Sequence, residues 1–420
     1  MSGSKKIIEL GIQELALSGD GVGRYESKVC FVPFSVPGDR LRVRVTRDRK
    51  NFSRCRIIEI IEPGRGRRDP PCRYFYKCGG CAWQHMDEEV QLYAKAGILS
   101  GSLGIDAVDF TRSGPAFDYR QTARFHLSGS EDGSLIIGFK KPRSHETVDI
   151  VSCPVVKPEI NSGLEVVRKL LAGAFTGEME LVLSSGSSGT AAVFYSTRAL
   201  GPEFYRAMER LASAGIKSII LNVDDHRSVI SRTGRLIVAG SDGHDLSVPA
   251  DGFMQACRDT NLEIGSTMRE WLEEHDFSGA MELYAGSANL TVSIAPFVKK
   301  TITAELDTHA AKAARENIDS RKIRGVTIYG MDALKAYVSY GRKTDLVVLD
   351  PPRDGNRDLA RAISEGNHRA VVYVSCNPAT LARDLKCLET GGYSMVRARG
   401  FDMFSQTAHM EAMVLLVRGG

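Results

Sequence analysis

Short apolar runs alternate with amphipathic stretches from residue 260 to the end of the chain. Residues 279–283, 346–349 and 370–374 have the length and composition of buried strands. Residues 379–388 have the spacing of a helix with one apolar face. Strands and helices that alternate in this way predict an α/β domain with a mostly parallel sheet.

The first part of the chain has a different pattern, in which apolar and polar positions alternate over short stretches at residues 5–10, 28–33, 40–46 and 53–62. Glycine-rich turns such as residues 18–23 separate these stretches. Strands of this length joined by tight turns predict a small β-barrel over residues 1–62.

A Pro, Gly and Arg segment at residues 63–71 marks the end of the predicted barrel. The middle section, residues 63–248, combines a helix predicted at 87–99 with several short strands and a hairpin across 184–189. Residues 249–420 then form the α/β domain. The sequence therefore predicts three domains.

Composition and charge narrow the classes of function. The 420 residues are 43% hydrophobic, which is enough for real cores, and the formal net charge is only +4. Arginines and lysines are dense between Arg40 and Arg73, which favours a polyanionic partner; the alternative is the solvated face of a charged strand. No apolar run is long enough to span a bilayer and no secretory signal is recognised, so we expect a cytoplasmic protein without a membrane partner.

Cys376 lies between a predicted strand and a predicted helix. A helix N-terminus lowers the pKa of a nearby thiol, so this cysteine is a candidate nucleophile, although a lone cysteine is more often a small buried hydrophobe. Asp350 ends another strand and is followed by Pro351 and Pro352. Because ligands bind at the carboxyl ends of parallel strands, Asp350 and Cys376 are expected to face one crevice.

A glycine turn at residues 284–289 follows the strand at 279–283 and begins a helix. Such a turn alone is a weak sign of nucleotide binding. Glu305 ends the next predicted strand, at a position where a ribose diol is commonly held. Together the turn and the acid predict a nucleoside-containing cofactor.

Three cysteines, Cys72, Cys78 and Cys81, lie close together in the sequence, and Cys153 is a fourth candidate far downstream. Thiolates with intervening glycines favour an iron–sulfur cluster or zinc. The spacing alone leaves iron–sulfur, zinc and neither open. His85 is either a zinc ligand or a structural histidine at a helix start.

These motifs together resemble the RNA 5-methyluridine methyltransferases. The resemblance rests on the cysteine triad with Gln84 and His85, on Cys153, and on three segments at residues 283–289, 350–353 and 375–383. It implies a Rossmann-like class I methyltransferase domain, a central α+β domain and an OB-like TRAM β-barrel. Within the family this cysteine pattern is typical of 23S rRNA enzymes that carry a [4Fe-4S] cluster, with Cys72, Cys78, Cys81 and Cys153 as its ligands.

The resemblance also implies a mechanism. Cys376 would add to C6 of uridine, the methyl group would come from S-adenosylmethionine, and Glu411 would remove the C5 proton. The residues that match the family's cofactor pocket are Gln255, Tyr284, Asn289, Glu305, Asp332 and Asp350. Cys257 and Ala288 depart from the family pattern, which calls for asparagine and glycine there, and Arg353 is expected to contact RNA phosphate.

The expected substrate is structured RNA, most consistent with 23S rRNA, from which the target base is extruded to reach Cys376. A tRNA substrate, a cytosine C5 methyltransferase and a non-catalytic RNA-binding protein are the alternatives. Phe75, Tyr76 and Trp83 either stack on bases or pack over the cluster. A monomer is the default oligomeric state.

Overall fold

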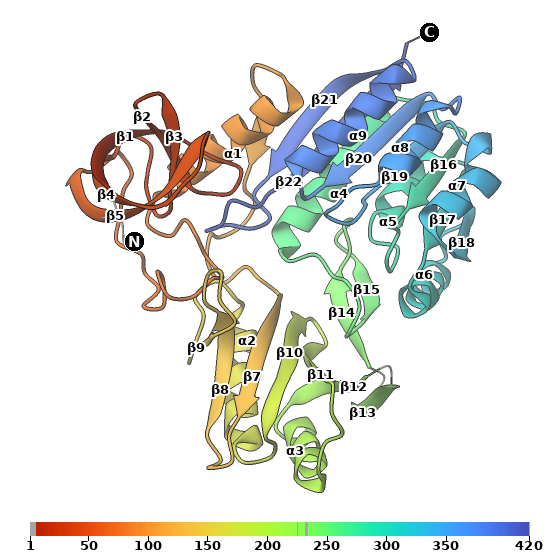
Figure 1. Ribbon diagram of the computed structural model, residues 1–420. Helices are drawn as coiled ribbons and strands as arrows, with labels where there is room; N and C mark the ends of the chain where they lie inside the picture. Colours follow the sequence, from red (N-terminus) through yellow and green to blue (C-terminus); the bar gives the residue numbers. More distant parts are fainter. Residues whose placement is uncertain (1–5, 225, 232–233, 420) are drawn as a thin grey trace.

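The computed structural model describes residues 6–224, 226–231 and 234–419. Figure 1 shows an N-terminal barrel, a central domain, and a large α/β domain formed mainly by the C-terminal part of the chain. No helix in the described ranges is both long and apolar enough to cross a membrane.

The barrel is closed, with strand order β1-β2-β3-β5-β4. Its strands are β1 (Ile7–Leu15), β2 (Gly21–Tyr25), β3 (Lys28–Val32), β4 (Arg40–Asp48) and β5 (Phe52–Glu62). The predicted barrel is confirmed. The predicted strands did not include β2, because three glycines and a charged residue between residues 19 and 24 were interpreted as a turn.

The basic run on the barrel is partly neutralised by neighbouring acids. The guanidinium of Arg42 pairs with Glu9 and with Glu59 on adjacent strands, and Arg40 pairs with Glu62 at 3.0 Å. These pairs are exposed, so each contributes little to stability. The basic run therefore has features of both interpretations: it forms a solvated strand face, and positive charge remains on it for a polyanionic partner.

The central domain contains a seven-stranded sheet of order β13-β12-β11-β10-β7-β8-β9, whose core packs against α2 (Pro158–Leu171) and α3 (Pro202–Ser213). The predicted hairpin at residues 184–189 joins two of these strands. The strands are β7 (Thr122–Gly129), β8 (Leu135–Lys140), β9 (Thr147–Asp149), β10 (Gly177–Gly186), β11 (Gly189–Ser196), β12 (Ile216–Val223) and β13 (His226–Ser231).

A two-stranded ribbon, β14 (Arg235–Ala239) and β15 (Asp245–Pro249), stands between the central sheet and the α/β domain (Figure 1). Its apolar side chains join a buried cluster with residues of β11, of β12 and of helix α6 (Thr308–Ser320). The ribbon therefore packs against both domains.

The α/β domain has an eight-stranded sheet of order β18-β17-β16-β19-β20-β22-β21-β6. The strands β16 to β20 are parallel, as predicted, and β22 runs antiparallel to both of its neighbours. The strands are β16 (Gly279–Leu283), β17 (Lys300–Glu305), β18 (Val326–Gly330), β19 (Leu346–Leu349), β20 (Ala370–Ser375), β21 (Tyr393–Phe401), β22 (Glu411–Arg418) and β6 (Asp109–Thr111).

Helices cover both faces of this sheet, and alternate residues of its strands enter the two buried clusters. One cluster includes α1, α7, α8 and α9, and the other includes α4 and α5. The bounds are α1 (Glu88–Leu103), α4 (Arg258–Glu273), α5 (Thr291–Ile294), α7 (Ala333–Tyr340), α8 (Arg357–Ser364) and α9 (Pro378–Thr390), with 3-10 helices η1 (Ala295–Phe297) and η2 (Gly341–Lys343).

The middle section does not form one compact unit with the bounds that we predicted. Strand β6 pairs with β21 at the edge of the large sheet, and α1 packs on the same sheet through Leu99. The buried ammonium of Lys95 on α1 lies 2.5 Å from a carboxylate oxygen of Asp402. Residues 88–111 thus belong physically to the α/β domain.

Candidate active site and cysteine cavity

Three predicted site residues directly follow neighbouring parallel strands. Tyr284 follows β16, Asp350 follows β19 and Cys376 follows β20. The strands are in register, since Leu283 pairs with Leu349 and Leu349 with Tyr373. The structure therefore brings these side chains to one edge of the sheet, where α/β proteins bind their ligands.

Glu411, the first residue of β22, lies next to Cys376. Ser375 of β20 pairs with Ala412 of β22 across the antiparallel strands, so Cys376 and Glu411 occupy the next position of this ladder. Only 6% of Glu411 is exposed. Burial, and then the charge of Asp350, raise the pKa of Glu411 well above its ordinary value, and burial also raises the pKa of Asp350.

The thiol of Cys376 is not activated in the way that its position suggested. Burial, and next the charges of Glu411 and Asp350, raise its pKa from 9.0 to about 11, whereas the charge of Arg353 opposes them. The predicted lowering of this pKa by the helix N-terminus is wrong. Asn377 is the N-cap of α9 and its side chain accepts from the Ala379 amide, so Cys376 lies outside the helix.

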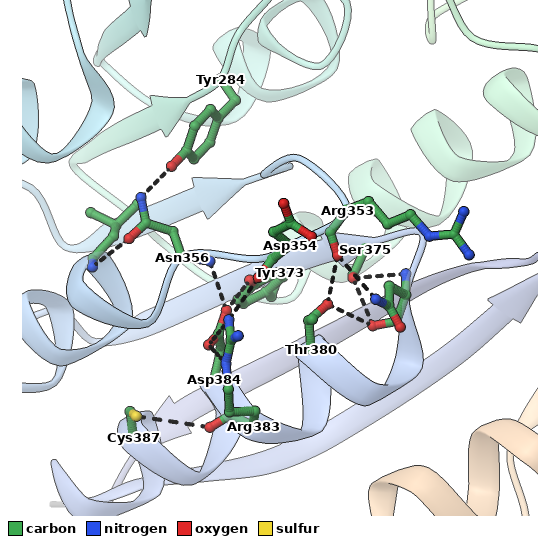
Figure 2. Close-up of polar contacts among 12 residues, drawn as sticks. Tyr284, Arg353, Asp354, Asn356, Tyr373, Ser375, Thr380, Arg383, Asp384 and Cys387 are labelled. Carbon is green, nitrogen blue, oxygen red and sulfur yellow. Dashed lines mark hydrogen bonds and ion pairs between the residues drawn. The ribbon is translucent and has the colours of Figure 1, made fainter. Parts of the chain in front are cut away.

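A hydrogen-bonded network fixes the loop after β19 against α9 (Figure 2). The buried carboxylate of Asp384 accepts from the Tyr373 hydroxyl at 2.7 Å and from the Asn356 amide at 2.9 Å. The side chain of Asn356 donates to the Tyr284 hydroxyl at 2.7 Å. The network thus links the turn after β16, the loop after β19 and the helix after Cys376.

Arg353 and His409 lie at the mouth of the crevice. The Arg353 backbone carbonyl accepts from the side chains of Asn377 and Thr380, both at 3.0 Å, so the loop position of Arg353 is fixed. Its guanidinium is 3.3 Å from Nδ1 of His409. Burial and the Arg353 charge lower the pKa of His409 to about 4, so the imidazole is neutral at pH 7. Sequence reasoning did not single out His409.

A cleft beside the glycine turn collects four of the six predicted cofactor residues: Gln255, Tyr284, Asn289 and Asp350. Glu305 lies at its edge, because its carboxylate accepts from the Gly286 amide at 2.8 Å. Asp332 does not line this cleft, and its carboxylate caps α7 by accepting from the Lys335 amide at 3.0 Å.

Asn289 is engaged by the protein. Its amide group exchanges two hydrogen bonds with the side chain of Asn261, at 2.8 and 3.0 Å, and its Oδ1 also accepts from the Ser241 amide. The side chain therefore ties the glycine turn to α4 and to the loop after β14. Direct contact of Asn289 with the cofactor remains a prediction.

Glu282 is a further acid in this cleft that sequence reasoning did not assign. It is 2% exposed, its carboxylate accepts from the Thr291 hydroxyl, and burial raises its pKa to about 8. The sequence carried a signal, because an acid inside an apolar strand needs a partner.

The four predicted cluster cysteines, Cys72, Cys78, Cys81 and Cys153, line one cavity of about 230 Å³. The distant Cys153 is therefore brought to the triad. In the described part of the chain, no three His, Cys, Asp or Glu side chains are grouped closely enough to hold a single metal ion. The thiols surround the cavity without converging on one point.

Burial raises the pKa of Cys78 to about 11 and that of Cys81 to about 12. One of the sulfurs already has a hydrogen-bond donor, since the Gly80 amide donates to Sγ of Cys78 at 3.4 Å. Four thiolates in such a cavity need a compensating cation, because burial disfavours the charged form.

The histidine and aromatic residues near the triad are mostly structural. His85 is fully buried, its Nε2 lies 3.2 Å from the Ser35 carbonyl, and it does not line the cysteine cavity. Phe75 and Trp83 are also buried, which leaves them no face for a base. Tyr76 is 53% exposed and has φ +64°. Of the three aromatic residues, only Tyr76 could stack on RNA.

Comparison with known proteins decides the family. The profile described as tRNA (Uracil-5-)-methyltransferase matches residues 248–419, and the TRAM domain matches residues 5–58. The 23S rRNA (uracil(1939)-C(5))-methyltransferase RlmD of Salmonella typhimurium is 30% identical over 425 residues, which cover 99% of this chain and 97% of the relative. The chain belongs to the RNA uracil-C5 methyltransferases.

Two further proteins are similar over nearly the full length of the chain. An uncharacterized RNA methyltransferase from Nostoc sp. is 30% identical over 98% of this chain and 96% of its own. The crystal structure of the Pyrococcus abyssi tRNA (uracil-54, C5)-methyltransferase superimposes with a TM-score of 0.72 at 23% identity, covering 98% of this chain and all of that one. The fold of this uracil-C5 methyltransferase is therefore that of the archaeal enzyme.

The two departures from the family pattern, Ala288 and Cys257, are both buried. Ala288 has φ +73°, the conformation that glycine adopts most readily, and it is fully buried. Cys257 is 2% exposed and is the N-cap of α4, without a side-chain hydrogen bond there. This uracil-C5 methyltransferase thus has an alanine in the left-handed conformation in the turn, and the side chain of Cys257 does not cap α4.

Proposed function

We propose that this protein methylates C5 of a uridine in 23S rRNA with S-adenosylmethionine as the methyl donor. The observation that carries the proposal is the placement of Cys376 beside Glu411, with Asp350 in the same crevice. Full-length similarity to RlmD supports 23S rRNA as the substrate.

The cofactor is assigned to the cleft beside the glycine turn. The Pyrococcus abyssi enzyme was crystallised in complex with S-adenosyl-L-homocysteine, which supports a cofactor of this kind in a chain of the same fold. Gln255, Tyr284 and Asp350 line the cleft. Glu305 would accept from the ribose hydroxyls and Asp332 would lie near the adenine amine. Asn289 positions the turn through Asn261.

Cys376 is the proposed nucleophile. Its thiol loses a proton to solvent, and the thiolate forms a bond to C6 of the extruded uracil. The C5–C6 π electrons move toward the O4 carbonyl, which makes C5 nucleophilic toward the methyl group that S-adenosylmethionine supplies. Asp350 accepts from ring N3–H. The positive charge of Arg353 lowers the pKa of Cys376 and so favours the attacking form.

Glu411 is the proposed base. After methyl transfer, C5 carries both a proton and the new methyl group. The carboxylate of Glu411 takes that proton, the C5–C6 double bond reforms and the bond between C6 and Cys376 breaks. Burial supports this role, because a carboxylate with a raised pKa is a stronger base than an ordinary one.

A [4Fe-4S] cluster is proposed for the cysteine cavity. The donor set is four thiolates, which suits iron–sulfur clusters, and a volume of about 230 Å³ suits a polyatomic group better than one ion. When bound, the cluster would hold the triad segment against the Cys153 loop, and we assign it no part in methyl transfer.

The cluster proposal is tested on anaerobically purified protein by iron and sulfide content and by visible absorption. We expect about four irons and four sulfides per chain for the wild type. The Cys81→Ser variant should lose the absorption band, whereas Cys387→Ser on α9 is the matched control and should keep it. Zinc in place of iron would contradict the proposal.

The function is tested with the purified holoenzyme on unmodified transcripts of 23S rRNA and of tRNA. Nucleoside mass spectrometry should detect 5-methyluridine in the 23S rRNA transcript. Methylation of the tRNA transcript alone would keep the chemistry and change the substrate. Formation of 5-methylcytidine would contradict the assignment of uracil.

A further inference from the structure

A second cavity, of about 630 Å³, lies where the central sheet, the β14–β15 ribbon and helix α6 meet. In Figure 1 the ribbon stands between the two domains, with α6 on the catalytic side. None of the lining residues belongs to the cofactor cleft or to the cysteine cavity. We call it the junction cavity, and its charged and histidine lining residues are Lys217, Arg227, Arg235, His309, Lys312 and Glu316.

The junction cavity has an excess of positive charge. Four of its lining residues are permanently cationic, and Glu316 is its one acidic lining residue. Arg227 is neutralised by a bidentate pair with Asp251, at 2.6 and 3.0 Å. Lys217 is exposed and makes no ion pair among the described residues, and Lys312 is 4.0 Å from Glu316. Among the described residues, two positive charges therefore remain for a ligand.

Arg235 lines the junction cavity and is held in place by an ion pair. Its Nη2 lies 2.9 Å from a carboxylate oxygen of Glu316, which holds the guanidinium in place. Its Nη1 is shielded from solvent and has no partner within the described ranges. Ser188 also lines the cavity, and its oxygen accepts from the Ile237 amide at 2.9 Å, so its hydroxyl proton is free to donate. The hydroxyl of Ser188 and the ammonium groups of Lys217 and Lys312 suit an oxyanion.

The chemistry and the size favour a phosphodiester. A guanidinium together with point-charge ammonium groups is the usual protein environment for phosphate. The volume of about 630 Å³ is much larger than one water molecule or one phosphate needs, and it can hold a nucleotide segment. Single-stranded RNA is bound by such basic grooves that follow its backbone.

The ribbon connects the junction cavity to the cofactor cleft. Arg235 and Ile237 point to the junction cavity, whereas Val238 of the same strand lines the cofactor cleft. On β15, Ser247 faces the junction cavity and Val248 faces the cleft. The two-residue period of a strand accounts for this alternation, and Ala239 at the end of β14 also lines the cleft. A ligand in the junction cavity would thus contact the outer face of the ribbon that forms one wall of the cofactor cleft.

The geometry points to the junction cavity as a binding site for the phosphodiester backbone of the substrate RNA, at a distance from the crevice that holds Cys376. The inference rests on the proposed function, since it takes RNA as the substrate. It places an RNA contact on the central domain and α6, in addition to the barrel.

The test compares two double variants of the full-length holoenzyme. Lys217→Gln/Lys312→Gln removes two charges from the junction cavity. Lys169→Gln/Lys299→Gln removes two exposed lysines elsewhere, on α2 and before β17, and is the matched control. Binding of an unmodified 23S rRNA transcript is measured by filter retention between 50 and about 300 mM KCl, where each phosphate contact contributes a definite salt dependence.

If two single-strand phosphate contacts are removed, the slope of log K against log salt should become less negative by about 1.4 in the junction-cavity variant. Its affinity near 0.1 M salt should fall about 25-fold. The control should keep the wild-type slope. Arg235→Lys should weaken binding with an unchanged slope, because the charge stays and the guanidinium fork is lost. Melting curves of all variants verify folding.

An unchanged slope and affinity in the folded Lys217→Gln/Lys312→Gln variant would overturn the inference. A second result would also overturn the inference: inorganic phosphate or AMP raises the melting temperature of the wild type but not of this variant, while the variant binds RNA normally. The cavity would then be a site for small anions. The proposed function is separable. If the wild type forms 5-methyluridine and the variant keeps the wild-type slope, only the inference is refuted. If the slope is reduced in the variant but the wild type methylates neither RNA, only the proposed function is refuted.

Discussion

Replacement of Glu411 by glutamine should have opposite effects on the reactivity of Cys376 and on turnover. The pKa of Cys376 is raised from 9.0 to about 11, first by burial and next by the charge of Glu411. At pH 8 roughly 0.1% of such a thiol is ionised. Removal of the Glu411 charge should lower the pKa of Cys376, and a drop of one pKa unit raises the thiolate fraction about tenfold.

The rate gain is smaller than the gain in thiolate. A less basic thiolate is a weaker nucleophile, and a Brønsted slope of about 0.4–0.5 removes about threefold of the advantage. Alkylation of Cys376 by iodoacetamide at pH 8 should therefore be faster in Glu411→Gln, by about threefold for each pKa unit that the thiol loses. Turnover should fail, because a glutamine cannot take the C5 proton, and a covalent protein–RNA adduct should accumulate.

Peptide mass spectrometry measures the alkylation rate, with Cys387 in a separate tryptic peptide as the internal reference. Glu389→Gln, an exposed substitution near the end of α9, is the matched control and should behave as the wild type. A Cys376 that reacts at the wild-type rate or more slowly in Glu411→Gln would refute the electrostatic reasoning. Normal turnover in that variant would refute the assignment of the base.

Three further outcomes are expected. Cys376→Ala should abolish methyl transfer and adduct formation while calorimetry shows nearly unchanged cofactor affinity; residual turnover would contradict its role. Lys95→Met should cost about 3–5 kcal/mol of unfolding free energy in denaturant titrations, because the fully buried Asp402 loses its partner, and Lys169→Met on the surface should cost little. The raised pKa of Glu282, about 8, means that the folded protein holds this proton more tightly than the unfolded chain, so stability falls as pH rises from 4.5 to 8. Glu282→Gln should reduce that fall in melting temperature between pH 5 and pH 8.5, and an identical fall in the variant would disprove it.

Local sequence signals predicted the catalytic edge of the sheet well. Asp350 and Cys376 each end an apolar run, and parallel pairing necessarily brings such positions together. The barrel was predicted from alternation alone, and its missed strand β2 is rich in glycine. Glycine signals a turn in the sequence, although here it allows close packing, since a Cβ at Gly23 would lie 2.5 Å from the Gly11 carbonyl oxygen.

What the sequence did not predict depends on tertiary contacts. Residues 88–111 join the α/β domain through the buried Lys95–Asp402 pair and an edge strand, and the two charges are 307 residues apart in the chain. The thiol pKa was mispredicted for the same reason. A helix N-terminus is visible in the sequence, but the burial of Cys376 and the closeness of Glu411 are properties of the folded chain.

Asn289 shows a subtler limit. Its position in the glycine turn matched a cofactor contact, and the residue does line the cleft. Its amide, however, is used by Asn261, a partner on another helix. A motif thus predicts where a side chain lies more reliably than it predicts which atoms the side chain contacts.

The most direct test of the central claim is nucleoside mass spectrometry of rRNA and tRNA from cells with and without the gene, followed by mapping of the modified position. The account predicts that deletion removes a 5-methyluridine from 23S rRNA, that the wild-type gene restores it, and that the Cys376→Ala gene does not. An unchanged 5-methyluridine content in both RNAs of the deletion strain would contradict it.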